Sequence, residues 1–185
     1  MSLRWLPNAL SLLRIALVGP ILWLIIAGHY PAALLLFLFA GVTDVVDGYL
    51  AKQFDWRTWL GALLDPIADK LLIAGLFVTL VYTGDIPFWL AAAVIIRDAV
   101  IVAGATLYHF LIGPVEGAPT RLSKLNTALE LLFVLLILSQ ASFDWPPLAT
   151  ITIVGAGVLV TVVLSGMDYV WSWSRRARDA AKGSA

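Results

Sequence analysis

The stretch PAALLLFLFAGVTDVVDGYLAKQFDWRTWLGALLDPIADK, residues 31–70, carries an apolar run, a short polar turn and the start of a second apolar run. The runs that flank the turn reach the length of about 20 mainly apolar residues that a transmembrane helix needs. The turn, residues 52–59, contains the charged and aromatic side chains that are typical of a membrane interface. The stretch therefore predicts two antiparallel helices in a membrane.

The whole chain has the composition of an integral membrane protein. Of its 185 residues, 61% are hydrophobic and 13% are charged, and its mean hydropathy is +0.93; a soluble domain would be about a quarter charged. The period-2 alternation of barrel strands is absent, and the apolar runs are too long for such strands. We expect an all-α protein with one domain, residues 1–185, whose six transmembrane helices cover residues 9–27, 31–51, 60–82, 87–112, 122–138 and 148–173.

The sequence argues against several other kinds of protein. The formal net charge is zero, whereas a nucleic-acid-binding domain needs a basic patch. There are no cysteines, which excludes disulfides and thiolate metal sites. The first apolar run is longer than the about 7–15 residues of a signal-peptide core and contains Arg14. We therefore interpret it as a retained helix, preceded by a short interfacial segment, SLRWLPN.

The distribution of Lys and Arg predicts the orientation in the membrane. Residues 29–30, 83–86 and 140–147 include neither Lys nor Arg. The opposite helix ends carry Arg4, Lys52, Arg57, Arg121, Lys124, Arg175, Arg176, Arg178 and Lys182. Because loops rich in Lys and Arg stay in the cytoplasm, we expect both termini and the turn at residues 52–59 on the cytoplasmic side of the cytoplasmic (inner) membrane.

Four aspartates flank this turn. Asp44 and Asp47 are spaced i, i+3 near the end of the second expected helix, and Asp65 and Asp69 are spaced i, i+4 near the start of the third. Each pair therefore lies on one helix face. Because the turn brings the chain back antiparallel, we expect the four carboxylates to converge on one pocket.

A bare carboxylate cluster is unfavourable in a membrane. One aspartate at the centre of a membrane helix costs about 2.5–3.5 kcal/mol, and neighbouring like charges repel one another. Either some of the carboxyl groups are protonated or cations lie among them. Oxygen ligands without His or Cys suit Mg²⁺, Mn²⁺ or Ca²⁺, and four carboxylates can share two ions. Any one of these aspartates alone is explained as a helix cap or a solvated residue, whereas four at this spacing indicate a functional site.

Small residues and a lysine accompany the aspartates. Gly48 and Gly61 allow a bulky ligand to approach the backbone, or alternatively allow two helices to pack closely. Ala51 lies one helical turn beyond Asp47 on the same side of the helix, and its small side chain leaves room for a ligand there. Lys52 offers a positive charge to a phosphate, or alternatively extends from the interface toward water.

The pattern Asp44-x2-Asp47-Gly48-x2-Ala51-Lys52-x8-Gly61-x3-Asp65-x3-Asp69 resembles the signature of the CDP-alcohol phosphatidyltransferase family, D-x2-D-G-x2-A-R-x8-G-x3-D-x3-D. The resemblance extends to PNALSLLR (residues 7–14), to GALLDPIADKLL (residues 61–72) and to the six-helix layout. Lys52 departs from the pattern, because the family usually has Arg there. Lys keeps the positive charge of Arg, but it lacks the planar guanidinium, which can donate two parallel hydrogen bonds to a phosphate.

This resemblance implies a reaction, a site and an assembly. Family members transfer a phosphatidyl group from CDP-diacylglycerol to an alcohol and release CMP, in a polar cavity that faces the cytoplasm. The resemblance implies a homodimer, and two divalent cations, Mg²⁺ or Mn²⁺, with Ca²⁺ bound but a poorer activator. Asp69 would be the general base and, with Asp44, Asp47 and Asp65, a metal ligand. The CDP-binding residues would be Asp44, Asp47, Gly48, Ala51, Lys52, Gly61 and Asp65.

The acceptor alcohol is indicated by a second stretch, APTRLSKLNTALELL, residues 118–132. It resembles the P-T-x-x-S-K-x-N-T-A of transferase-type cardiolipin synthases, whereas phosphatidylglycerophosphate synthases have a lysine where this chain has Asn126. The resemblance implies phosphatidylglycerol, a phosphodiester with one charge, as the acceptor. The alternative acceptor is glycerol 3-phosphate, a monoester that would favour another cation. The expected acceptor-binding or phosphate-binding residues are Arg97, Arg121, Lys124 and Asn126.

Two of these assignments have structural alternatives. Arg97 lies near the middle of the fourth expected helix beside Asp98, so it is either an anion ligand or one half of an ion pair. Arg121 and Lys124 are either acceptor ligands or anchors at the cytoplasmic interface. A different class of protein, a divalent-cation transporter, would need acidic residues at several depths along a path, whereas the four aspartates lie near one membrane face.

Overall fold

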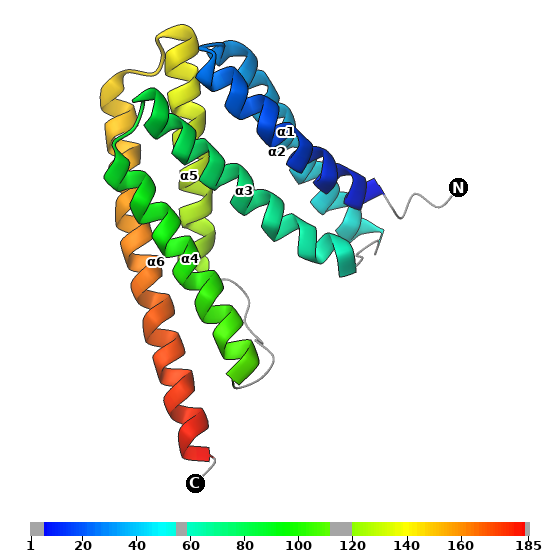
Figure 1. Cartoon of the computed structure of the whole chain (residues 1–185), viewed down its shortest axis with the longest axis vertical. Helices are drawn as coiled ribbons and strands as arrows, with labels where there is room; N and C mark the ends of the chain where they lie inside the picture. Colours follow the sequence, from blue (N-terminus) through cyan, green and yellow to red (C-terminus); the bar gives the residue numbers. More distant parts are fainter. Residues whose placement is uncertain (1–5, 55–58, 112–119, 184–185) are drawn as a thin grey trace. The chain divides into compact units, whose positions relative to one another are not determined.

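The computed structural model describes residues 6–54, 59–111 and 120–183. In this part of the chain all regular structure is helical (Figure 1). The helices are α1 (Leu6–Ile26), α2 (Tyr30–Gln53), α3 (Trp59–Thr83), α4 (Phe88–Leu111), α5 (Arg121–Phe143) and α6 (Leu148–Gly183). Helices are the expected result for such an apolar chain, because a backbone in lipid must form its own hydrogen bonds.

The expected helix boundaries agree closely for α2, α3 and α4, whereas α5 continues to Phe143, beyond the expected end at residue 138. The helices at the two ends of the chain also differ from expectation. Helix α1 already begins at Leu6, inside the expected interfacial segment, whose first residues lie outside the described part of the chain. Helix α6 continues to Gly183, beyond the expected end at residue 173. Its last turns read SRRARDAAK, which lacks Gly and Pro and is rich in strong helix formers.

The exposed surface of the helices is apolar. Three described segments are long and apolar enough to cross a membrane: Ala9–Ile26, Arg121–Phe143 and Leu148–Tyr169. Large apolar side chains are widely exposed, for example Leu35 (68%), Val45 (71%) and Ile153 (71%). Exposed apolar surface on this scale is typical of a protein that contacts lipid.

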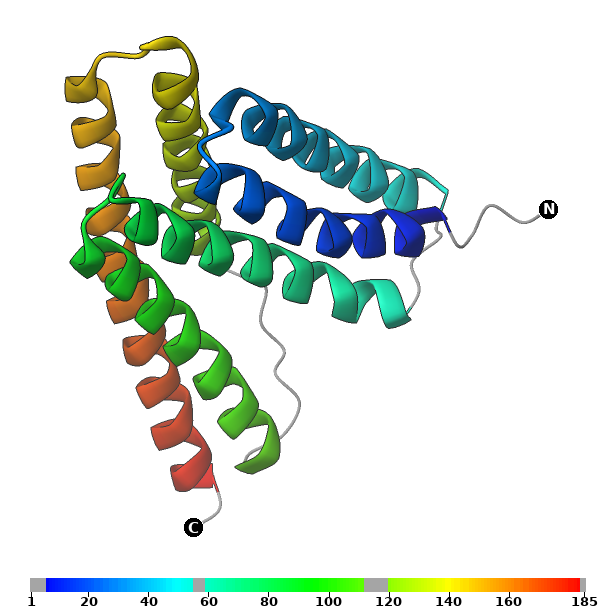
Figure 2. The same cartoon turned by 45° about the horizontal axis from the view of Figure 1, so that its top comes forward.

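The chain forms two compact units. Unit 1 consists of Met1–Pro87 and Val134–Leu148, and unit 2 of Phe88–Phe133 and Ala149–Ala185, so that α5 contributes to both. In unit 1, α1 packs against both α2 and α3, and the three helices lie side by side in Figures 1 and 2. The fully buried apolar side chains of α1 and α3 include Ile21, Ile25, Leu76, Phe77 and Leu80.

Glycines end two helices of unit 1. Gly28 follows α1 with a φ of 76°, in the left-handed region that glycine adopts without strain. Its amide donates to the carbonyl of Ile25, and the amide of His29 donates to that of Leu24. This pair of bonds satisfies the last carbonyls of a helix. Gly84, with a φ of 84°, ends α3 in the same way.

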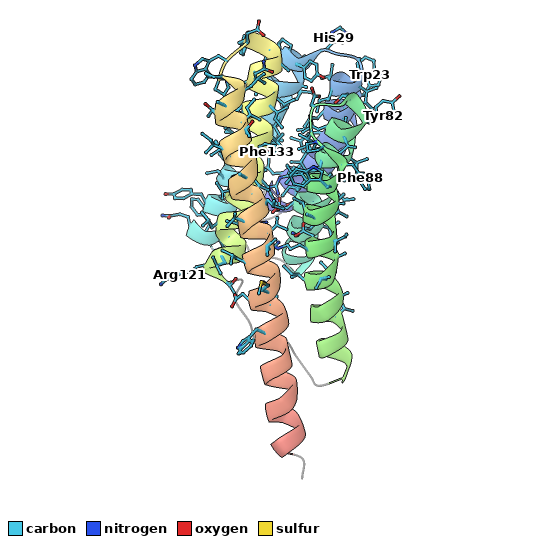
Figure 3. All side chains as sticks on the ribbon, turned by 90° about the vertical axis from the view of Figure 1, so that its left-hand side faces the viewer. Trp23, His29, Tyr82, Phe88, Arg121 and Phe133 are labelled. Carbon is cyan, nitrogen blue, oxygen red and sulfur yellow. The ribbon has the colours of Figure 1, made fainter. Side chains whose placement is uncertain are left out.

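The same end of unit 1 carries aromatic side chains and a polar contact between helices. Figure 3 shows Trp23, His29 and Tyr82 at this end. The hydroxyl of Tyr30, at the start of α2, donates a hydrogen bond to Asp85, just after α3, over 2.9 Å. Asp44 and Asp69 lie toward the other ends of α2 and α3.

Candidate functional site

A buried arginine joins the two helices that carry the aspartates. Arg14 lies on α1, and its side chain is 1% exposed. Its Nη2 forms an ion pair with Oδ1 of Asp44 on α2, and its Nη1 donates a hydrogen bond to Oδ1 of Asp69 on α3 over 2.7 Å. Because α1 packs against both helices, its guanidinium can reach both carboxylates. The structure therefore brings Asp44 and Asp69 together.

Both carboxylates remain accessible. The side chains of Asp44 and Asp69 are 46% and 45% exposed, in contrast to the buried guanidinium. Gly48 follows Asp44 by one helical turn, and a Cβ added to it would meet no described atom within 4 Å. Accessible carboxylate oxygens beside open backbone fit a hard divalent cation and the phosphates that accompany it. The residues present therefore suit the metal that the sequence predicts.

The remaining residues of the signature are placed only by their backbones. Asp47 follows Asp44 by three residues on α2, and Asp65 precedes Asp69 by four residues on α3, so each pair shares a helix face. Convergence of all four carboxylates stays a prediction. For five expected site residues the structure describes the course of the helix and nothing further: Asp47, Ala51, Lys52, Gly61 and Asp65.

In unit 2, Arg97 is held by three neighbours. The residue is 5% exposed and lies on α4. Its Nε donates to Oγ of Ser165 on α6, its Nη2 donates to Oγ of Ser123 on α5, both over 2.9 Å, and its Nη1 pairs with Oδ1 of Asp98 over 2.7 Å. The ion pair is one of the two alternatives that the sequence left open. The guanidinium also connects the three helices of unit 2.

Asn126 belongs to a second buried polar group of unit 2. The residue is 0% exposed; its amide nitrogen donates to Oε1 of Glu130 over 2.6 Å, and its side-chain oxygen accepts from Thr161 of α6 over 2.9 Å. Buried polar groups are normally hydrogen-bonded, and these bonds fix the side chain. Its position is therefore structurally constrained, a feature that was not expected from the sequence. The available signal was the i, i+4 spacing of Asn126 and Glu130.

Arg121 and Lys124 stand at an accessible helix start. The amide of Ser123 donates to Oγ1 of Thr120 over 3.2 Å, so Thr120 is the N-cap of α5. The two basic side chains lie three residues apart in the following turn and are both exposed, and Figure 3 shows Arg121 pointing away from the helix. The positive end of the helix dipole adds to their charge. This turn can attract an anion.

Comparisons with known proteins identify a family. The sequence model described as CDP-alcohol phosphatidyltransferase matches residues 4–164. A cardiolipin synthase (CMP-forming)/mitochondrial hydrolase fusion protein of Schizosaccharomyces pombe is 36% identical over 89% of this chain, and a cardiolipin synthase (CMP-forming) of Homo sapiens is 32% identical over 89%. The chain spans 30% and 60% of the lengths of these two proteins. A CDP-diacylglycerol–glycerol-3-phosphate 3-phosphatidyltransferase of Pseudomonas fluorescens is 34% identical over 76% of this chain and 75% of that protein.

Proposed function

Because the chain belongs to the CDP-alcohol phosphatidyltransferase family, we propose that it transfers the phosphatidyl group of CDP-diacylglycerol to a hydroxyl of phosphatidylglycerol, giving cardiolipin and CMP. The observation that best supports this proposal is the approach of Asp44 and Asp69, from two helices, to one buried guanidinium while both carboxylates stay about half exposed. Accessible oxygen ligands on an apolar helical unit suit a substrate that has both a lipid and a pyrophosphate part.

The residues of unit 1 have separate roles in this reaction. Asp69 accepts the proton of the acceptor hydroxyl, whose oxygen forms a bond to the lipid-bearing phosphorus while the bond from this phosphorus to the CMP oxygen breaks. Divalent cations, Mg²⁺ or Mn²⁺, would neutralise the charge of the pyrophosphate. Two of them would be held by Asp44, Asp47, Asp65 and Asp69. The CDP moiety would lie against the same aspartates and against Gly48, Ala51, Lys52 and Gly61.

We expect the enzyme to be a multi-pass protein of the cytoplasmic (inner) membrane. All six helices cross the bilayer, the two units work as one domain, and both termini and the active site face the cytoplasm. The three apolar segments and the absence of Lys and Arg from residues 29–30, 83–86 and 140–147 support this topology. The acyl chains of the substrates then stay in lipid while the nucleotide enters from water. The working form is a homodimer.

Basic residues of unit 2 would bind the acceptor. The exposed Arg121 and Lys124 hold the single charge of the phosphodiester, and Arg97 supports them from α4. Asn126 is neutral and adds no further positive charge, which suits an acceptor phosphate with a single charge. The relatives named cardiolipin synthase support phosphatidylglycerol as the acceptor. The second candidate is glycerol 3-phosphate, which the Pseudomonas fluorescens relative favours because the chain covers 75% of that protein.

An acceptor assay separates these functions. Purified full-length protein in mixed micelles is given CDP-diacylglycerol, Mg²⁺ and either acceptor at equal concentration, and CMP and lipid products are measured. We expect phosphatidylglycerol to be used at least about tenfold faster, a difference of about 1.4 kcal/mol in transition-state stabilisation, with cardiolipin as the product. Faster conversion of glycerol 3-phosphate would establish the second candidate. Metal flux into sealed vesicles, with no CMP released from CDP-diacylglycerol in the presence of either acceptor, would indicate a cation transporter.

A further inference from the structure

We propose that Arg14 is a positioning residue of the metal site. From the protein interior it orients Asp44 and Asp69, so that two helices present their carboxylates to the same cations. This inference rests on the proposed function. The signature of the family lies wholly on α2 and α3, whereas Arg14 lies on α1. The site would therefore depend on a third helix that carries none of the expected ligands.

The geometry of the side chain supports this role. A guanidinium presents its nitrogens in a rigid plane, and charge-assisted hydrogen bonds to carboxylates are among the strong ones. In Arg14 one terminal nitrogen pairs with Asp44 and the other with Asp69, so a single planar group fixes two carboxylates from different helices. An ammonium is a point charge on a flexible chain and cannot hold both in a fixed plane.

The difference in burial shows on which side the arginine lies. The guanidinium side chain is 1% exposed, whereas the side chains of Asp44 and Asp69 are 46% and 45% exposed. Arg14 therefore contacts the carboxylates from the protein interior, and cations can approach them from outside. Hydrogen bonds from such outer partners orient metal ligands, and their loss typically weakens metal binding or activity about 10–100-fold.

Metal affinity distinguishes this role from two others. A guanidinium that competed with the metal would weaken binding, so its removal would strengthen it. A guanidinium that only connected the helices would affect the stability of unit 1 and leave the affinity unchanged. If Arg14 positions the carboxylates, its removal weakens metal binding while the protein stays folded.

The test is a titration of the purified full-length protein with Mn²⁺. The electron paramagnetic resonance signal of free Mn²⁺ measures how much of the ion is bound. We expect the dissociation constant to rise about 10–100-fold in Arg14→Gln. In Arg14→Lys, which keeps the charge and loses the fork, we expect a rise of at least about tenfold. An unchanged or lower dissociation constant in folded Arg14→Gln would overturn the proposal. If Arg14→Gln shows no cooperative melting transition in EDTA, it is not folded, and Arg14→Lys is used instead. An unchanged or lower dissociation constant in folded Arg14→Lys would then overturn the proposal.

Tyr30→Phe is the matched control. It removes a hydrogen bond between α2 and Asp85 in the same unit, but at the end away from Asp44 and Asp69. We expect its affinity for Mn²⁺ to equal that of the wild type. If the wild type and Arg14→Gln bind Mn²⁺ equally well, only the role of Arg14 is refuted. If the wild type binds no Mn²⁺, the proposed function fails, and the inference fails with it.

Discussion

Replacement of Asp69 by Asn is expected to lower CMP release from CDP-diacylglycerol by about a thousandfold or more. A positioned general base contributes about 10²–10⁴-fold to a reaction, and the same carboxylate is expected to bind metal. The amide of Asn has nearly the same shape, but it neither accepts the acceptor proton nor carries the charge that pairs with Arg14. The measurement is the initial rate of CMP release at saturating phosphatidylglycerol and Mg²⁺.

Asp144→Asn provides the matched control for this variant. Asp144 is exposed between α5 and α6 and has a φ of 54°, in the left-handed region that Asn adopts as readily as Asp. We expect it to retain the wild-type rate within about twofold, as is usual for an exposed residue away from a site. More than about a hundredth of the wild-type rate in Asp69→Asn would contradict the assignment of Asp69 as the general base, since even the lower limit for such a base is about 10²-fold.

Removal of divalent cations is expected to reduce CMP release to the background of the assay. Without cations, the four aspartates would repel the pyrophosphate instead of binding it. We expect the rate to fall at least about a thousandfold in excess EDTA, since Lewis-acid stabilisation of phosphoryl oxygens contributes several kcal/mol. Added Mg²⁺ or Mn²⁺ should restore the rate, whereas Ca²⁺ should bind and restore little of it.

A premixed sample of EDTA with an excess of Mg²⁺ controls for direct effects of the chelator. It should leave the rate unchanged. Turnover that persists at the full rate after exhaustive chelation would contradict a metal-dependent reaction and would leave the aspartates without their proposed role.

The helices of the protein could be predicted from the sequence, and so could the meeting of Asp44 with Asp69. The long apolar runs require helices in lipid, and Gly28 and Gly84 mark where two of them end. The partners of Arg14 could not be predicted, because the sequence around a single arginine in an apolar run does not show which distant residues it will contact. Its contact with Asp69 spans 55 residues of sequence.

The polar contacts of unit 2 show the same limit. The pairing of Arg97 with its neighbour Asp98 was one of two expected alternatives, but Ser123 and Ser165 lie 26 and 68 residues away along the chain. Asn126 was selected by its resemblance to a family motif, and its burial against Thr161 depends on how α5 packs with α6. Such contacts follow from tertiary packing, which a local pattern does not specify.

The number of metal ions bound per chain tests the central proposal most directly. Equilibrium titration of the purified protein with Mn²⁺ should give two bound ions in the wild type. Asp44→Asn and Asp69→Asn should each lose at least one of them, while Asp144→Asn should keep both. A wild type that binds no Mn²⁺, or aspartate variants that bind as many ions as the wild type, would contradict a divalent-metal site built from the carboxylates of α2 and α3.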